Sequence, residues 1–186
     1  MPDGSLIRKK NIKIAISGKS GCGNTTVTKL AANRLGLRFI NFTFRNLAAE
    51  KNISLEEVLR LAETEDYWDR EVDRRQIEEA LSDGEKGCVL GSRLAIWLLK
   101  EADLTVYLKA DTDIRVRRLI RREGGDYDSV AAFTRERDAR DRARYLRLYN
   151  IDNDDYGFAS LVIDSGLYTP DEIVDKIALI AQTVKT

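Results

Sequence analysis

Histidine is absent from the sequence, and cysteine, proline and methionine are rare. The missing histidine removes the commonest general base and the commonest metal ligand, which excludes histidine-based catalytic triads and zinc-dependent hydrolysis. The two cysteines, Cys22 and Cys88, give neither a disulfide framework nor the spacing of a metal site, a pattern typical of a reducing compartment. Phosphoryl transfer is compatible with this composition, because it depends mainly on positioning and charge stabilisation.

Long apolar runs and an excess of either charge are also lacking. The longest apolar run, Leu94–Leu99, is far shorter than a membrane span, and residues 1–10 carry charge without the apolar segment of a signal peptide. The 31 basic residues balance 31 acidic ones, so the chain as a whole does not attract nucleic acid or an anionic membrane. We therefore expect one cytoplasmic domain over residues 1–186, a loosely held arm without function at residues 1–10, and no nucleic-acid or membrane partner.

The sequence is organised around one glycine-rich stretch. The pattern G-x-x-x-x-G-K-[ST], the phosphate-binding loop, matches at Gly18, Gly23 and Thr25, but Asn24 stands where the pattern has lysine. An apolar β-branched run precedes the stretch and apolar residues at helical spacing follow it, so a turn that merely joins a strand to a helix is the weaker interpretation. Successive backbone N–H groups can then face one anion, and the Thr25 hydroxyl can bind Mg²⁺. The predicted phosphate-binding residues are Gly18, Lys19, Ser20, Gly21, Cys22, Gly23, Asn24, Thr25 and Thr26.

Beyond this loop, strand-like runs alternate with helical segments. The expected strands are residues 12–17, 37–42, 87–90, 104–108 and 161–163. The helical segments include two without an intervening strand between Ser54 and Gly84, and a long one from about Tyr127 to Tyr149. Capping boxes at Ser54–Glu57 and Thr169–Glu172 predict two helix starts. The alternation predicts an α/β fold with a five-stranded parallel sheet, whose ligands bind at the carboxyl ends of the strands.

Arginine is concentrated in residues 115–147. This segment carries eleven arginines, six acidic residues and no lysine, which gives a local charge of +5 (11 − 6) in a chain whose total is zero. Solvated helices with the ion pairs Arg137–Asp141 and Asp138–Arg142 are one interpretation. An anion-binding site is the other, and the exclusive use of arginine favours it, because the planar guanidinium suits phosphate. A phosphate-binding loop in the same chain points to a nucleoside triphosphate and a second phosphorylated substrate rather than to nucleic acid.

Four stretches carry a resemblance to a known family: Gly18–Thr26, Asp69–Gln76, Arg93–Trp97 and residues 137–144. Through them the chain resembles cytidylate kinases of the archaeal type, in the nucleoside monophosphate kinase superfamily of P-loop proteins. The resemblance covers essentially residues 12–180 and implies that superfamily's three-layer α/β/α fold. It also implies three parts within the domain: a core holding ATP (11–40, 84–120 and 136–186), a helical insertion holding the monophosphate (41–83) and a short lid (121–135).

The resemblance further implies roles for individual residues. ATP with Mg²⁺ would be the phosphate donor, and CMP, with dCMP as a second candidate, the acceptor. Substrate-binding residues would be Arg45, Arg70, Asp73, Arg93, Arg137 and Asp141. Arg137, Asp141 and Arg144 would contact the monophosphate and the transferring group, and Arg118, Arg121 and Arg122 would supply lid charge near ATP. Either Asp73 or Asp141 would accept a hydrogen bond from the cytosine amine.

Departures from the family pattern leave open questions. No acidic residue ends the third strand, so Asp111 or Asp113 would have to assist the metal. The segment before Arg45 lacks the family's glycine. We hypothesise that Lys19 joins the catalytic residues by supplying the charge that Asn24 lacks, and a solvated lysine is the alternative.

The expected activity is therefore ATP-dependent phosphorylation of CMP. The alternatives are a nucleotide-binding sensor or interaction protein of the same fold, with weak or no transfer, and a kinase for another small substrate. We expect a monomer or a weak homodimer.

Overall fold

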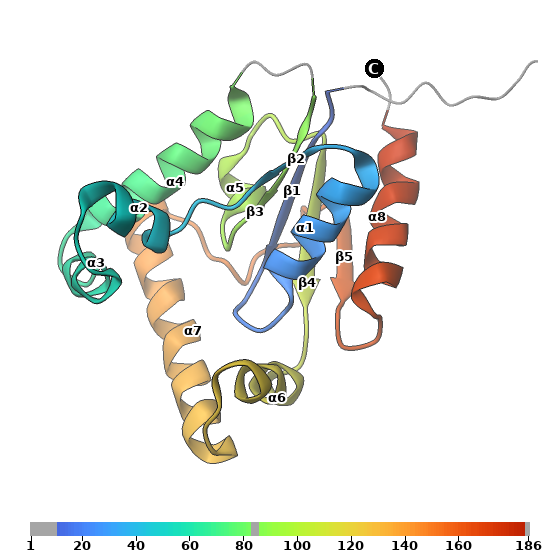
Figure 1. Ribbon diagram of the computed structural model, residues 1–186. Coiled ribbons are helices and arrows are strands. Elements are labelled where there is room, and N and C mark those ends of the chain that lie inside the picture. Colours follow the sequence, from blue (N-terminus) through green and yellow to red (C-terminus); the bar gives the residue numbers. More distant parts are fainter. Residues whose placement is uncertain (1–10, 83–85, 185–186) are drawn as a thin grey trace, which may run out of the picture.

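The computed structural model describes residues 11–82 and 86–184, in which strands alternate with helices (Figure 1). The strands are β1 (Lys13–Gly18), β2 (Arg38–Ile40), β3 (Cys88–Gly91), β4 (Leu104–Lys109) and β5 (Leu161–Asp164). The helices are α1 (Asn24–Leu35), α2 (Phe44–Lys51), α3 (Leu55–Ala62), α4 (Asp66–Leu81), α5 (Ala95–Leu98), α6 (Thr112–Glu123), α7 (Tyr127–Tyr149) and α8 (Pro170–Thr183). The expected arm at residues 1–10 and the expected helix end at Asp83–Gly84 lie outside the described residues.

The strands form one parallel sheet in the order β2-β3-β1-β4-β5, which confirms the predicted α/β fold. At its centre, Ile16 of β1 pairs with Gly91 of β3 and with Val106 of β4. Because the strands are parallel, the carboxyl ends of β1, β3 and β4 meet at one edge of the sheet. The phosphate-binding loop, Arg93 and α6 all follow these ends in the sequence.

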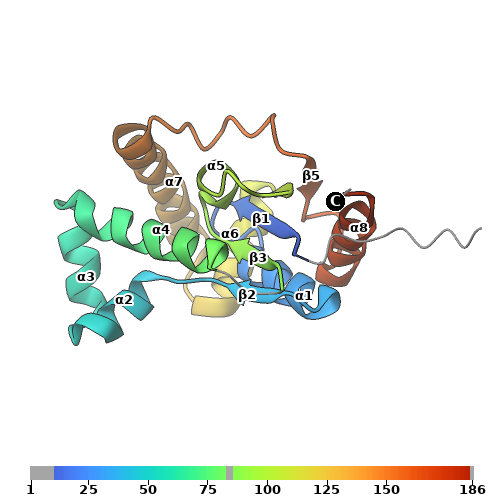
Figure 2. The same ribbon diagram turned by 90° about the horizontal axis from the view of Figure 1, so that it is seen from above.

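Helices cover both faces of the sheet (Figure 2). One apolar core lies between the sheet and helices α1 and α8, and the other between the sheet and helices α4, α5 and α7. Ile14, Ala15 and Ile16 alternate between the two cores along β1. A strand that is buried on both faces needs apolar side chains at successive positions, which explains why Ile14, Ala15 and Ile16 follow one another without a polar residue between them.

The insertion has a small core of its own, which joins α2 and α3 to the first half of α4. Three helices, α2, α3 and α4, thus lie between β2 and β3 in the sequence. Ser54 caps α3 by accepting a hydrogen bond from the Glu57 N–H at 3.0 Å. The Glu57 carboxylate binds Arg60 instead of returning to the cap, so the predicted capping box is only half formed. The second predicted box, from Thr169 to Glu172, is complete.

The expected lid, residues 121–135, spans the end of α6, the connection 124–126 and the first turns of α7. The long helix α7 has the predicted bounds. No helix within the described residues is long and apolar enough to cross a membrane.

The contact between β3 and α1 leaves no room for a side chain at Gly91. A Cβ atom there would lie 2.2 Å from the Thr28 Oγ1 atom of α1, a distance that requires the helix or the strand to move. We expect Gly91→Ala to lower the free energy of unfolding by about 1–3 kcal/mol, as overpacking does in other cores. Urea unfolding followed by circular dichroism measures this change.

Gly157→Ala is the matched control for Gly91→Ala. A Cβ atom at Gly157 would meet nothing within 4 Å. Its free energy of unfolding should stay close to that of the unsubstituted protein. Equal effects of the two substitutions would contradict the close approach of β3 to α1.

Candidate active site

The phosphate-binding loop curls between β1 and α1 through two glycines with positive φ, Gly21 at 84° and Gly23 at 95°. Gly23 is the N-cap residue of α1, so the first N–H groups of the helix lie beside the loop. These groups have no partner within the helix, and together with the helix dipole they favour a bound anion. Thr25 is exposed in the first turn of α1, where its hydroxyl can reach a metal ion on that anion.

Asn24 braces the loop. Its Nδ2 atom donates to the Gly18 carbonyl at 2.5 Å, across the loop from the end of β1 to the start of α1. The Asn24 Oδ1 atom is buried without a hydrogen-bond partner. An uncharged amide held in this way cannot supply the charge of the missing lysine.

Arg115 of α6 holds the loop from the other side. Its Nε atom donates to the Ser20 carbonyl at 2.7 Å, and its two Nη atoms bind both carboxylate oxygens of Asp138 on α7 at 2.7 and 2.8 Å. The sequence alone assigns Arg115 no role of its own and offers Arg142 as the partner of Asp138. One signal in the sequence pointed to Arg115. It lies four residues before Leu119, and this spacing places both side chains on the same face of the helix, which is the buried face of α6.

Lys19 extends from the loop to an acidic turn after α7. Its Nζ atom lies 2.5 Å from the Asp154 Oδ1 atom, and the two side chains are 24% and 46% exposed. The backbone of this turn is anchored to β4, because the Tyr107 hydroxyl donates to the Asn153 carbonyl and the Tyr107 ring stacks on Tyr156. Lys19 therefore faces a fixed carboxylate, in a pair exposed enough to exchange partners.

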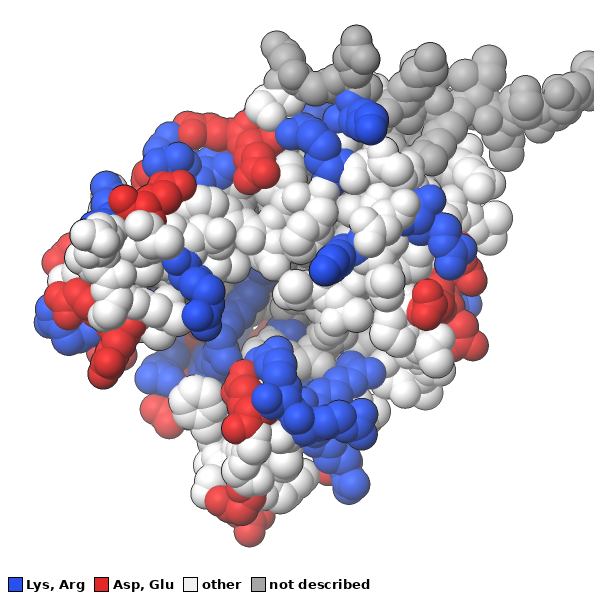
Figure 3. Space-filling view, in the orientation of Figure 1, with Lys and Arg blue, Asp and Glu red and all other residues white. Residues whose placement is uncertain are grey.

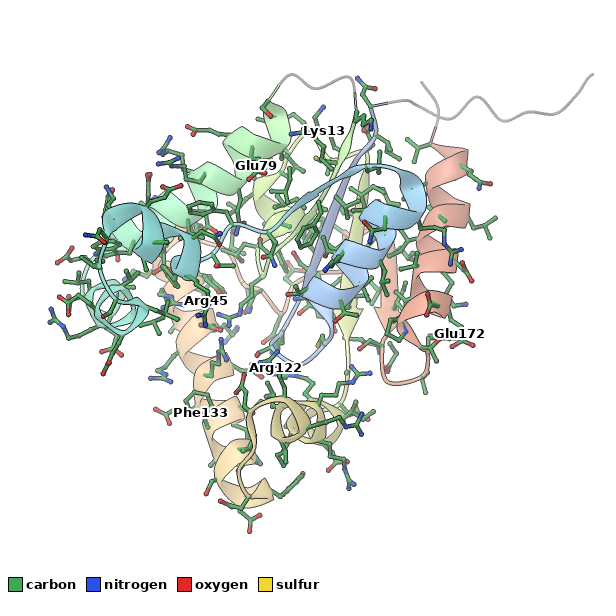
Figure 4. All side chains as sticks on the ribbon, in the orientation of Figure 1. Lys13, Arg45, Glu79, Arg122, Phe133 and Glu172 are labelled. Carbon is green, nitrogen blue, oxygen red and sulfur yellow. The ribbon has the colours of Figure 1, made fainter. Side chains whose placement is uncertain are left out.

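A single large cleft of about 980 Å³ runs from the loop to the insertion. Lys and Arg side chains gather around the hollow seen in Figure 3. Arg45 of α2 and Arg122 of α6 approach it from opposite sides (Figure 4). Most of the predicted site residues line this cleft: Lys19, Ser20, Gly21, Cys22, Gly23, Asn24, Thr25, Thr26, Arg45, Asp73, Arg93, Arg118, Arg121, Arg122, Arg137 and Arg144.

Two residues predicted for substrate binding do not line the cleft. The Arg70 guanidinium donates to the Leu148 carbonyl at 2.9 Å and stacks over the Tyr149 ring, so it joins α4 to α7. Asp141 is 6% exposed and lies behind the cleft arginines, each of its oxygens bound by one of them. The structure therefore brings neither side chain to the position expected from sequence.

Three arginines of the cleft form no ion pair or hydrogen bond with the described residues: Arg45, Arg121 and Arg137. Burial, and next the neighbouring Arg93 guanidinium, lower the pKa of Arg137. A half-buried cation without a counter-charge is costly in free energy unless an anion neutralises it. Arg118 donates to the Gly21 and Ser165 carbonyls and so joins the loop to the segment after β5.

At the end of the cleft away from the loop, arginine side chains form ion pairs with buried carboxylates. Asp141 binds Arg93 through Oδ2 at 2.8 Å and Arg144 through Oδ1 at 3.0 Å. The predicted pairs Arg137–Asp141 and Asp138–Arg142 are wrong, because Asp138 turns inward to Arg115, and Arg142 binds Asp152. Asp138 and Arg142 thus each pair with a residue outside α7 and not with each other.

Asp73 of α4 lines the same end. Its Oδ2 atom accepts a hydrogen bond from the Tyr149 hydroxyl at 2.7 Å. Burial raises the pKa of Asp73 to about 6, against the effect of this hydrogen bond.

The carboxylates proposed to assist a metal lie elsewhere. Asp111 is the N-cap residue of α6, and Asp113 binds Arg117 and Tyr127. Within the described residues, no cluster of three or more acidic, cysteine or histidine side chains could hold a metal ion alone. A magnesium ion here would need phosphate oxygens of a bound nucleotide beside the Thr25 hydroxyl, a donor set that suits this cation.

Several known proteins similar to this chain are named as kinases. The family described as "Cytidylate kinase-like family" matches residues 13–167. A protein named cytidylate kinase 2 from Borreliella afzelii is 46% identical over 170 residues, which cover 89% of this chain and 94% of that protein. A cytidylate kinase from Archaeoglobus fulgidus is 40% identical over 168 residues, 89% of this chain and 92% of that protein.

Solved structures with a similar fold include the shikimate kinase from Bacteroides thetaiotaomicron. It has a TM-score of 0.60 and 18% identity, over 91% of this chain and 97% of that one. At this identity the likeness concerns the fold, which is that of a P-loop kinase.

The raised pKa of Asp73 predicts that the stability of the protein depends on pH. Its pKa of about 6 in the folded protein lies above its ordinary value of 3.8, so the folded state binds this proton more tightly than the unfolded chain. Asp73 therefore lowers the free energy of unfolding as the pH rises from about 4 to about 6, and keeps it lower above that range. We expect Asp73→Asn to stabilise the protein at about pH 7.5 by up to ~3 kcal/mol, and to have little effect near pH 4.

Urea unfolding at a series of pH values measures this difference. Asn keeps an acceptor for the Tyr149 hydroxyl, so the substitution removes the charge and preserves the hydrogen bond. The exposed Glu63→Gln is the control and should show no such pH-dependent gain. A gain of Asp73→Asn that is equal at both pH values would contradict the raised pKa.

Proposed function

The chain belongs to the cytidylate kinase-like family, and on this premise we propose that it transfers a phosphoryl group from ATP to CMP. The observation that carries the proposal is that Arg45, Arg121 and Arg137, which have no ion pair with the described residues, line the same cleft as the phosphate-binding loop. They line one cleft with the loop, and its volume of about 980 Å³ is at the upper end for small-molecule sites.

On the donor side, the loop and the N-terminus of α1 would bind the phosphates of ATP. Thr25 would hold Mg²⁺ beside them, and the metal would neutralise charge on the transferring group. Arg118 already joins the loop to the segment after β5, and Arg121 and Arg122 reach the same side from α6. The core would thus hold ATP, and residues 121–135 would close over it as a lid.

On the acceptor side, the insertion at 41–83 would hold CMP. Arg45, Arg93 and Arg137 would bind its phosphate, since they enter the cleft from α2, the end of β3 and α7. Charge spreads over the phosphoryl oxygens during transfer, so preorganised guanidiniums that exclude water stabilise the transition state. Asp141 would act by positioning Arg93 and Arg144, and Arg70 by joining α4 to α7.

We also propose that Lys19 supplies the charge that Asn24 lacks. Lys19 lines the cleft next to the loop, and its only ion pair among the described residues is with Asp154. Such a partly exposed pair contributes at most ~1 kcal/mol, so a polyphosphate can replace Asp154 as the partner of the ammonium group.

The activity is tested by measuring ADP release with Mg-ATP and each of CMP, dCMP, UMP, AMP and GMP. We expect the highest kcat/KM with CMP and turnover with dCMP. The test includes calorimetric binding of ATP. Tight ATP binding without turnover of any monophosphate would contradict the proposal and would favour a sensor of the same fold.

Lys19→Met tests the role of the ammonium group. We expect kcat/KM for ATP to fall by roughly 100-fold, the usual effect of removing one preorganised charge donor. Lys29→Met is the matched control, because Lys29 is exposed on α1 and does not line the cleft. Full activity of Lys19→Met would show that the arginines alone neutralise the phosphates.

A further inference from the structure

Two polar atoms in the acceptor half of the cleft are buried without a hydrogen-bond partner among residues 11–82 and 86–184: the Oδ2 atom of Asp69 and the Nε atom of Arg144. Asp69, on α4, is only 6% exposed, and both side chains line the cleft. The Arg144 Nε atom lies 3.5 Å from the Asp69 Oδ1 atom, an ion pair without a hydrogen bond. Buried polar atoms are rarely left unpaired, so this acceptor and donor point to a missing ligand.

The neighbouring carboxylates are less available. Both oxygens of Asp141 are bound by arginines, and its side chain does not line the cleft. Asp73 already accepts a hydrogen bond from Tyr149. Asp69 alone among the three combines a place in the cleft wall with a buried oxygen that lacks a partner.

The position of Arg144 fits a contact with the base better than one with the phosphate. Seven residues separate it from Arg137, which corresponds to about 10 Å along α7. If Arg137 binds phosphate near the loop, Arg144 therefore lies where the nucleoside extends. Apolar side chains that can pack on a base line this end of the cleft: Phe42, Phe44, Leu55, Leu59 and Val72.

The chemistry of the two atoms matches the edge of cytosine. Cytosine presents an amino donor beside the N3 acceptor, whereas uracil presents an oxygen acceptor beside an N–H donor. We propose that the Asp69 carboxylate accepts a hydrogen bond from the cytosine amine while the Arg144 Nε–H donates to N3, so that this pair selects CMP over UMP. This inference rests on the proposed function and names the residues that determine its specificity.

Asp69→Asn tests the assignment. The amide keeps the size of the side chain and adds an N–H group that can donate a hydrogen bond to the uracil oxygen. We expect the ratio of kcat/KM for CMP to that for UMP to fall by roughly 10- to 100-fold, through a higher KM for CMP. The KM for ATP should stay unchanged. A ratio equal to that of the unsubstituted protein would overturn the proposal.

Asp73→Asn is the matched control, since it makes the same change one turn further along the same face of α4. It should alter the values for CMP and UMP alike and leave their ratio unchanged. A loss of selectivity in Asp73→Asn instead of Asp69→Asn would assign base recognition to Asp73 and overturn the proposal.

Thermal unfolding checks that Asp69→Asn folds. If it does not, Arg144→Lys decides, because lysine keeps the charge and lacks the Nε–H group. Its CMP-to-UMP ratio should fall as well, and an unchanged ratio would count against the proposal. An unsubstituted protein that phosphorylates no monophosphate would refute the proposed function, whereas a CMP kinase whose variants stay selective would refute only this inference.

Discussion

The geometry of the candidate site depends on one buried cation, the guanidinium of Arg115. Its side chain is 4% exposed, and a charge so deeply buried is tolerated only when it is paired and hydrogen-bonded. Asp138 of α7 and the Ser20 carbonyl of the loop provide these partners. The Arg115 side chain consequently joins the phosphate-binding loop, α6 and α7, and it fixes the distance between the loop and the middle of α7.

The same residue type has two opposite uses in this chain. Arg115 is fully paired and joins three elements of the structure, whereas Arg45, Arg121 and Arg137 face the cleft without a carboxylate partner in the part of the chain that the structure describes. A chain with a net charge of zero can thus present a strongly cationic cavity, because its acidic residues pair with arginines elsewhere. The cleft is cationic because of the local arrangement of charge and not because of the total.

The sequence was sufficient for the sheet, the loop and the bounds of α7, because each has a local signal. A doubly buried strand is apolar throughout, a phosphate loop needs glycines, and a long helix has a regular period. The ion pairs considered as one interpretation of α7 do not form, because helical spacing shows which residues share a face but not what that face contacts. Arg70 and Asp141 were misplaced for the same reason, and Asp69 was missed because only tertiary packing leaves one of its oxygens without a partner.

Helix α7 runs without interruption through 23 residues, about 35 Å, from the lid region to the insertion. It carries Arg137 beside the loop and Arg144 beside Asp69. Because α7 is one continuous helix, a rigid-body shift that brought Arg137 towards the loop would also displace Arg144 at the far end of the cleft. Binding at the two half-sites would then be energetically coupled and, by thermodynamic necessity, reciprocal. The same shift of α7 would then affect both the recognition of the base and the transfer of the phosphoryl group.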